Sequence, residues 1–497
     1  MKRLYGVVAC CAVVVYLGAL ANRWAWDDVP IIFYNPLVHA PDAVWRAFLS
    51  PYWPAQMGGA MYRPLPIATY AIDWHVGSVV WFHALNLVWH AAASVAIAAI
   101  AFRLAGERAA WVAGLLFAVH PVHVEAVANI VGRSEMMAAL FAMLAVYAAL
   151  IVDSPLASLA ALAGGLASKE NAAVVPGLIV WGWIIGLYRP SGRRMALYAA
   201  GWVAVALVYG AVRWTVLHEF ARITNMAAVF IGASPIDVKL TATAELADFA
   251  RLLVFPLTLR VDYSPAERTL VTSVLDPRFL AGLACLVAWA LLTWFTWRHG
   301  RTVEAFGLGW IGIALSPVAN LIFPAGVLVA ERTLYLPSAG LALVLGAWLP
   351  RATPAHWRTL VAVLVVLGGA RTALRVPVWR DDHAVVLSEF EDSPHSFDGP
   401  ARMVTIYLNA HQPTKAVEAY RTAVAIFDRL PWLFMWGADA GLTAGHEGLA
   451  DSAFARLEQL CNGCDYYYAF EANAARARGD SGVARQILAR RPATVAK

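Results

Sequence analysis

The sequence predicts an all-α fold: a polytopic helical membrane domain, followed by a small α-helical domain of tetratricopeptide (TPR) repeats. Two observations predict the membrane domain. Hydrophobic residues make up 60% of the chain and charged residues only 14%, which is far from the composition of a soluble protein. The apolar residues also gather into about 11 runs that approach the length of a membrane-spanning helix. Beyond residue 374, charged residues return and a repeat begins.

The predicted transmembrane helices follow the apolar runs in order. We expect them at about 4–21, 80–101, 109–120, 136–152, 155–167, 172–187, 195–214, 279–297, 303–322, 333–349 and 357–374. Two of them, 109–120 and 155–167, are shorter than the roughly 20 residues that cross the hydrocarbon. The first run also fits a signal peptide, in which Ala19, Leu20 and Ala21 would form the cleavage site.

Basic residues predict the sides of the membrane, because Lys and Arg collect in cytoplasmic loops. One side carries Lys2, Arg3, Arg103, Arg108, Arg189, Arg193, Arg194, Arg298, Arg301, Arg351 and Arg358. The short loops opposite carry only Arg133, Lys169 and Arg332. The net charge of +5 therefore needs no nucleic acid as a partner. We expect outer loops at about 22–79 and 215–278, and a C-terminal tail on the outer side.

The tail after residue 374 contains a sequence repeat. Its members are Ala416, Ala450 and Ala484, spaced by 34 residues, and Tyr420, Phe454 and Leu488 with the same spacing. A small residue where two helices approach, with a large apolar residue one turn later, is typical of TPR helix pairs. A generic helical tail is the alternative. The pair Cys461 and Cys464 favours a local disulfide, since no second pair completes a zinc site.

Two adjacent carboxylates, Asp27 and Asp28, follow the first apolar run within a few residues. A charge costs several kcal/mol inside a bilayer and little at its surface, so acids at the exit of a span are often functional. We interpret Asp27 and Asp28 as the acid/base centre of a membrane glycosyltransferase. The alternative is an ordinary polar flank that ends a span.

Three further polar groups lie between the apolar runs. His120, His123 and Glu125 form one short segment that would ligate a divalent metal, although hydrogen bonding that shapes a cavity is the favoured role. Lys169 and Glu170 are interpreted as an ion pair that holds two spans together or contacts a polar substrate.

Glu331 and Arg332 precede Tyr335 at the outer start of a predicted span. An arginine near the bilayer surface suits a lipid phosphate, because its guanidinium offers several donors and keeps its charge. The other cations expected on the outer side are Arg63, Arg133 and Lys169, and each is a candidate for the same phosphate.

Five motifs occur in order along the chain: YRPL at 62–65, HPVHVEAV at 120–127, GRSE at 132–135, DYS at 262–264 and AERTLYLPS at 330–338. Together they resemble the transmembrane-and-TPR O-mannosyltransferases, polytopic enzymes of the GT-C class. The resemblance covers about residues 22–340 by motif, and the repeats extend it. The chain departs from the animal members of that family in having about three repeats instead of a long array.

The resemblance implies a polyprenyl-phosphate sugar donor, usually of mannose, and a Ser or Thr hydroxyl of a protein as acceptor. It implies that Asp27 or Asp28 is the base. We expect no cofactor, with a divalent metal as the alternative. His120, His123, Glu125, Glu170, Glu331 and Tyr335 would shape the cavity and meet the acceptor. The Arg- and Ala-rich composition indicates a bacterial member, in the inner membrane with a periplasmic active site. The alternatives are an enzyme that glycosylates a lipid or glycan, a non-catalytic TPR scaffold and a transporter.

Overall fold

A computed structural model describes residues 1–54, 61–218, 226–263, 265–460, 465–477 and 479–490. Regular structure in these ranges is helical, without any β-strand. The chain divides into two compact units. Unit 1 comprises Met1–Met226, Ser234–Val261 and Leu270–Val385, and unit 2 comprises Ala227–Ala233, Asp262–Thr269 and Val386–Lys497. Cys461 and Cys464 lie outside the described residues, so their disulfide stays a prediction.

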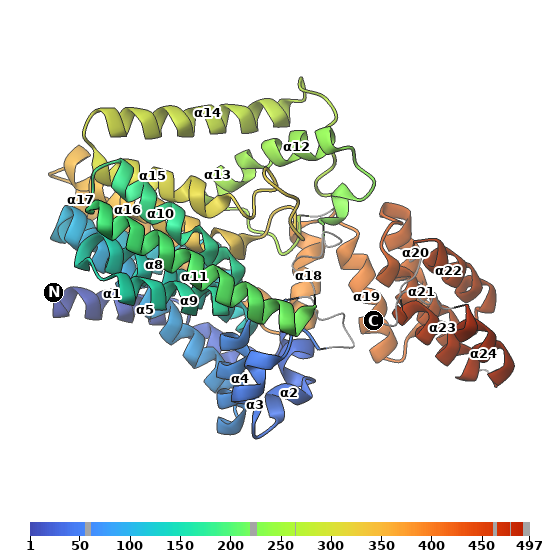
Figure 1. The fold of residues 1–497 in the computed structure, drawn as a ribbon. Helices are drawn as coiled ribbons and strands as arrows, with labels where there is room; N and C mark the ends of the chain where they lie inside the picture. Colours follow the sequence, from blue (N-terminus) through green and yellow to red (C-terminus); the bar gives the residue numbers. More distant parts are fainter. Residues whose placement is uncertain (55–60, 219–225, 264, 461–464, 478, 491–497) are drawn as a thin grey trace. The chain divides into compact units, whose positions relative to one another are not determined.

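Unit 1 is a bundle of helices with short helices at one end (Figure 1). Its helices are α1 (Lys2–Val14), α2 (Pro36–His39), α3 (Ala43–Arg46), α4 (Pro64–Val76), α5 (Val79–Ala105), α6 (Glu107–Ala118), α7 (Val124–Ala128), α8 (Arg133–Tyr147), α9 (Pro155–Ser168), α10 (Val175–Ile184), α11 (Gly192–Leu217), α12 (Pro235–Ala244), α13 (Leu246–Val254), α14 (Pro277–Arg298), α15 (Thr302–Leu315), α16 (Tyr335–Ala352) and α17 (Trp357–Arg375). The boundary with unit 2 falls inside α18 (Asp382–Asp392).

Local chemistry sets where several of these helices begin. Ser154, Ser234 and Asp276 each stand just before a proline, and each accepts a hydrogen bond from a backbone N–H in the first turn of the helix that follows. Such a side chain satisfies a donor that the helix leaves open. Proline suits the first helical position, because that residue needs no N–H donor there. Helices α9, α12 and α14 therefore start where the sequence provides both features.

The predicted count of eleven transmembrane helices is not confirmed. By length and composition, six described helical segments can cross a membrane: Val79–Ala105, Ile130–Val152, Gly192–Leu217, Pro277–Arg298, Glu331–Ala352 and Trp357–Trp379. A seventh forms if Glu107–Ala118 and Pro121–Ala128, bent by 48° at their break, count as one. Several apolar helices of this length make the chain a multi-pass membrane protein.

The predicted spans that are not among these segments are helical but short. Helix α9 has 14 residues, about 21 Å at 1.5 Å per residue, which is less than the hydrocarbon thickness. The run expected at 303–322 ends as a helix at Leu315, shortly before Pro317 and Pro324. Proline at these places cannot donate a helical hydrogen bond, so the helix does not continue.

Close helix contacts in unit 1 depend on small residues. Where α15 meets α16, a Cβ added to Gly307 would lie 2.4 Å from the carbonyl oxygen of Gly340. No side chain fits there, and the backbones approach as they do in other membrane helix pairs.

A separate apolar cluster under α2–α4 includes Ile32, Tyr70 and Phe82. This cluster holds residues 22–54 and 61–79 as a packed structure with short helices.

Unit 2 contains antiparallel helix pairs. Their helices are α19 (Asp398–Asn409), α20 (Pro413–Ile426), α21 (Pro431–Thr443), α22 (Glu447–Leu460), α23 (Asp465–Ala477) and α24 (Ser481–Ala489). Each pair turns through a left-handed residue, His411, Gly445 or Gly479, a conformation that ends helices. The repeated alanines, Ala416, Ala450 and Ala484, are all buried. The 34-residue spacing is thus a spacing of turns and of core alanines, and the assignment of these pairs as TPR repeats stays a prediction.

Candidate active site

The two adjacent carboxylates occupy different environments. Asp28 is fully buried, and its Oδ1 accepts a hydrogen bond from the backbone N–H of Val131 at 2.9 Å. Its Oδ2 accepts from the N–H groups of Ala25 and Ile130, at 3.2 and 3.4 Å. Burial raises the pKa of Asp28 to about 8, although these backbone donors lower it. Asp28 therefore fastens the segment after the first helix to the turn that precedes α8.

Asp27 is only half-buried and lies beside other site residues. Its charge acts on Arg332 and on Tyr52, whose ring lies under the guanidinium of Arg63 at 5.2 Å. Burial raises the pKa of Tyr52 to about 12, the charge of Arg63 lowers it and the charge of Asp27 raises it. The preceding residue, Trp26, has a φ of 58°, a backbone conformation that few bulky residues adopt. Of the two acids, Asp27 is the more exposed.

Arg332 and Glu125 form a double contact. The backbone N–H of Arg332 donates to Glu125 Oε2 at 2.8 Å, and the guanidinium donates to Oε1. The side chain of Glu125 is 2% exposed, whereas that of Arg332 is 31% exposed. Part of the Arg332 side chain therefore remains accessible, and a buried partner fixes the orientation of its guanidinium.

Lys169 and Glu170 do not pair with each other, which corrects the prediction. Lys169 pairs with Glu135 of α8, and Glu170 accepts hydrogen bonds from Arg63 Nε at 3.1 Å and from Arg213 Nη1 at 3.2 Å. The backbone of Lys169 is extended, so successive side chains point to opposite sides. The two neighbours thus connect three different helices.

These pairs form one connected group, which we call the charge cluster. It contains Asp27, Arg63, Glu125, Glu135, Lys169, Glu170, Arg213 and Arg332. The charges of Arg63 and Arg332 act on Lys169, and that of Glu135 acts on both Arg63 and Arg332. Four acids face four bases, so the site can hold ions of either sign only by local rearrangement of these pairs.

Arg133 is not part of the charge cluster and has a structural role. Its side chain is 0% exposed and donates to Asn86 Oδ1 at 2.8 Å, Thr69 Oγ1 at 3.1 Å and the carbonyl of Phe82 at 2.9 Å. It also pairs with Asp73. Its three guanidinium nitrogens are therefore already bonded within the protein, and we leave Arg133 out of the phosphate-binding set.

The predicted cavity residues with aromatic side chains form a buried polar core. His90 Nδ1 lies 2.8 Å from the hydroxyl of Tyr335, and His123 Nε2 lies 2.7 Å from Ser338 Oγ. Both His123 and Tyr335 are fully buried. These two side chains therefore belong to the packed interior and do not line an open cavity. Glu331 is also buried, and its Oε1 accepts a hydrogen bond from the backbone N–H of Arg260.

The segment considered as a metal site directs its side chains to separate partners. His120 Nε2 lies 2.9 Å from the carbonyl oxygen of Leu253, His123 contacts Ser338 and Glu125 contacts Arg332. Within the described ranges, no three His, Cys, Asp or Glu side chains are grouped to hold a metal. The metal interpretation has no support in this geometry.

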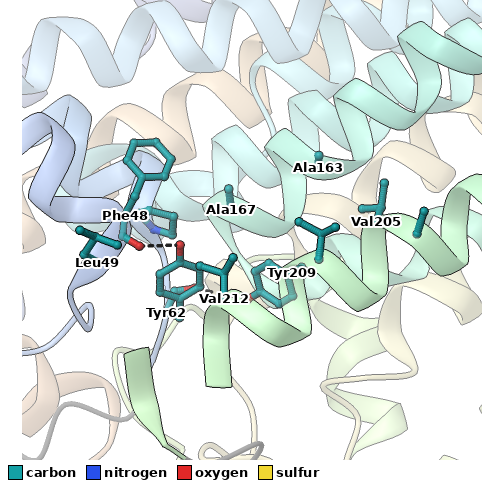
Figure 2. A pocket seen from close by; sticks show the side chains of 11 residues that line it. Phe48, Leu49, Tyr62, Ala163, Ala167, Val205, Tyr209 and Val212 are labelled. Atoms are coloured by element: carbon teal, nitrogen blue, oxygen red, sulfur yellow. Dashed lines mark hydrogen bonds between the residues drawn. The ribbon is translucent and has the colours of Figure 1, made fainter. Parts of the chain in front are cut away.

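An apolar groove lies between α9 and α11 (Figure 2). It encloses about 510 Å³ and is lined by Phe48, Leu49, Tyr62, Pro64, Ala163, Ala167, Ala204, Val205, Val208, Tyr209 and Val212. Alanines of α9 form one wall and larger residues of α11 the other. The hydroxyl of Tyr209 donates to the carbonyl of Tyr62 at 3.3 Å. Arg63 follows Tyr62, and Arg213 lies one helical turn beyond Tyr209, so the groove ends at the Glu170 side of the cluster.

Sequence reasoning did not assign Arg213, Glu135 or His90 to the site. A signal for the first two was present, because each is a charged residue within or beside an apolar run, and such residues are usually functional. His90 lies inside the run expected at 80–101 and carries a similar polar signal.

The fold and the site define a multi-pass helical membrane protein with a charged site at the end of an apolar groove. Its relatives are animal proteins named protein O-mannosyl-transferases. Human TMTC3 is 26% identical over 436 residues, which cover 78% of this chain and 47% of that protein. Human TMTC4 is 27% identical over 464 residues, with 78% and 61% covered. Human TMTC1 is 24% identical over 496 residues, with 85% and 55% covered.

The chain spans about half the length of these relatives. No protein-family model matches the chain, and no solved structure does. The homologues therefore support a protein O-mannosyltransferase family, while the activity of this chain is a matter for proposal.

Proposed function

We propose that the protein is a membrane glycosyltransferase that moves mannose from a polyprenyl-phosphate donor to Ser or Thr hydroxyls of a protein. The observation that carries this proposal is the position of Asp27, a half-buried carboxylate whose charge acts on Arg332, a residue with a partly exposed side chain. A base next to a fixed cation suits a reaction in which an alcohol loses a proton while a phosphate leaves. The names of the homologues support the same reaction.

In this mechanism, Asp27 accepts the proton of the acceptor hydroxyl as its oxygen bonds to C1 of the sugar. The bond between C1 and the phosphate oxygen breaks, and its electron pair stays on the polyprenyl phosphate. Arg332 holds the developing negative charge, and Glu125 keeps its guanidinium in place. Asp28 positions Asp27 by binding the neighbouring backbone. No cofactor takes part in these steps.

The apolar groove between α9 and α11 suits the lipid chain of the donor. An isoprenoid chain is apolar and branched, and the groove wall combines small alanines with valines and two tyrosines. Its phosphate would then arrive near Arg63, Arg213 and Lys169. Glu170, whose side chain is 34% exposed, pairs with both Arg63 and Arg213. When the donor binds, these two arginines would leave Glu170 and pair with the phosphate.

The protein acceptor and the location complete the proposal. The helix pairs of unit 2 act as TPR repeats that engage the acceptor protein, and the active site faces the non-cytoplasmic side of the bilayer. In a bacterial cell that side is the periplasm of the inner membrane. The relatives named above are animal proteins, so the bacterial source rests on composition alone.

One experiment tests the reaction. The full chain is purified and incubated with radiolabelled polyprenyl-phosphate mannose and peptides that contain Ser and Thr, and label on the peptide is counted. We expect transfer by the wild type and about 10²- to 10⁴-fold less by Asp27→Asn. Label on a lipid or glycan would favour that acceptor class, and no label on any acceptor would favour a scaffold or a transporter.

A second experiment tests the groove. Ala167→Phe places a ring in the groove, whereas Ala160→Phe places one on an exposed part of α9 outside it. We expect a higher KM for the donor in the first variant and an unchanged KM in the second. Equal donor KM values in the wild type and both variants would refute the groove as the donor site.

A further inference from the structure

A second groove lies where three helices of unit 1 begin. It is formed by α1, α6 and α17, encloses about 810 Å³ and is lined by Arg3, Glu107, Arg108, Trp111, Leu115, Trp357, Arg358, Val361, Ala362, Val365 and Val366. It shares no residue with the charge cluster. Glu107 and Arg108 stand at the start of α6, whereas Glu125 of the cluster follows the far end of that helix. We call it the basic groove.

The basic groove changes from charged to apolar along its helices. On α6, Arg108 is followed at helical spacing by Trp111 and Leu115. Residues three and four apart share a helix face, so these side chains form one stripe.

Helix α17 repeats this order with Arg358, Val361 and Val365. The arginines are exposed at the ends of the helices, and Val361 is buried further along. A charged rim above an apolar floor matches the polarity of a phospholipid from headgroup to acyl chain.

The arginines of the rim have no acidic or hydrogen-bonding partner in the described part of the chain. Arg3, Arg108 and Arg358 form no ion pair or side-chain hydrogen bond with any described residue, whereas Arg351 pairs with Glu304 at 2.9 Å and Arg194 pairs with Asp153 at 3.6 Å. Three guanidinium groups and the carboxylate of Glu107 leave a formal charge of +2 in the groove.

Tryptophan also marks the groove. The guanidinium of Arg358 lies 5.6 Å from the ring centre of Trp357, and Trp111 lines the other wall. Tryptophan is enriched at the level of the headgroups. The three arginines also belong to the set that the sequence predicts on one side of the membrane, and the structure brings them to one place.

We propose that the basic groove binds an anionic glycerophospholipid. Its phosphate lies among Arg3, Arg108 and Arg358, where charge-assisted hydrogen bonds are available, and an acyl chain lies against Leu115, Val361 and Val365. Charge complementarity selects an anionic headgroup, because a zwitterionic lipid brings no net charge to a site of +2. The lipid would join α1 and α17 to α6, and it would stabilise their packing without entering the proposed reaction.

Native mass spectrometry of the purified full chain tests this proposal. The protein is titrated with phosphatidylglycerol and, separately, with phosphatidylcholine of the same acyl chains. We expect phosphatidylglycerol to bind more tightly. In the triple variant Arg3→Gln, Arg108→Gln, Arg358→Gln, its affinity should fall about 100-fold, since each basic residue contributes about 1 kcal/mol near an anionic lipid and about 1.4 kcal/mol corresponds to a tenfold change.

The matched control is Arg193→Gln, Arg298→Gln, Arg301→Gln. It removes the same charge from exposed arginines outside the groove, and it should keep the wild-type affinity. Equal losses in the two triple variants would show a diffuse surface effect and overturn the proposal.

A measurement on the wild type alone guards against a variant that fails to fold. Phosphatidylglycerol should raise the melting temperature more than phosphatidylcholine does, and this difference should shrink at high salt because exposed charges are screened. Equal melting temperatures with the two lipids at low salt would also overturn the proposal. Neither result depends on transferase activity, so the proposed function is tested separately.

Discussion

Glu125 accepts hydrogen bonds from both the backbone N–H and the guanidinium of Arg332, a residue 207 positions further along the chain. The contact joins two of the sequence motifs at one point. Arg332 also has two features at once, because it pairs with a buried acid and still keeps 31% of its side chain exposed. The exposed part is what a phosphate would meet.

Replacing Arg332 should therefore affect both stability and rate. Arg332→Ala leaves Glu125 buried without its partner, which costs about 3 to 5 kcal/mol of folding stability. The same substitution removes a contact that is made in the transition state. The activation free energy should therefore rise by about 2 to 4 kcal/mol, and the rate should fall roughly 30- to 1000-fold. Arg332→Lys keeps the charge but not the forked geometry, and donor use should weaken more than acceptor use.

The double variant Arg332→Ala, Glu125→Gln separates the two effects. Removing the acid should restore much of the melting temperature, while transfer stays low. If transfer returned with stability, Arg332 would have only a structural role.

The adjacent acids should respond differently to the same change. Asp27→Asn should lose about 10²- to 10⁴-fold in transfer, because the base is gone, and should melt as the wild type does. Asp28→Asn turns an amide N–H₂ toward backbone donors, and it should destabilise the protein by about 1 to 3 kcal/mol. Thermal unfolding and transfer rates of both variants check this, and a normal rate in Asp27→Asn would contradict the assignment of the base.

Glu389 in unit 2 should make stability depend on pH. It is fully buried; burial raises its pKa well above the ordinary value, the charge of Asp398 raises it further and that of Arg402 lowers it. In an unfolded chain the pKa of Glu is about 4.3. As pH rises, the unfolded state therefore loses this proton at a lower pH than the folded state does. The stability that protonated Glu389 contributes is fully present below about pH 4.3 and is lost as pH rises through the pKa of Glu389 in the folded state.

Glu389→Gln stays neutral and escapes this loss. Its melting temperature should exceed that of the wild type at pH 8 and come close to it at pH 4.5. The exposed Glu391 provides the control, since Glu391→Gln should change neither value. An equal gain from Glu389→Gln at both pH values would show that packing, and not ionisation, is responsible.

Helix packing in unit 1 should not tolerate a methyl group at Gly307. The added Cβ would meet the carbonyl of Gly340 at 2.4 Å, and overpacking of this kind costs about 1 to 3 kcal/mol. Gly210 of α11 has no atom within 4 Å of an added Cβ, so Gly210→Ala should be neutral or stabilising. Melting temperatures of the two variants measure the difference, and equal values would contradict the close contact of α15 and α16.

Reporter fusions test the predicted topology. A reporter active only outside the cytoplasm should be active when fused after Lys497 and inactive when fused near Arg193. The expected reason is the concentration of basic residues in cytoplasmic loops. The reverse pattern would invert the assignment of sides, and activity at both places would change the number of spans between them.

The sequence alone predicted the local features of this protein well. Apolar runs and the 34-residue spacing depend on neighbours a few positions apart, so the run expected at 155–167 is a helix that starts at Pro155, and the repeated alanines at 416, 450 and 484 are buried. The number of spans was less predictable. Whether an apolar helix is long enough to cross depends on where it ends, and α15 ends before its apolar run does.

Only the tertiary structure decided which charges meet. Lys169 pairs with Glu135 and not with its neighbour Glu170, Arg133 is enclosed by Asp73, and Asp28 is buried where Asp27 is not. The partners in these contacts lie tens to hundreds of residues apart. An ion pair or a burial depends on distance in space, which residue types and their spacing along the chain do not determine.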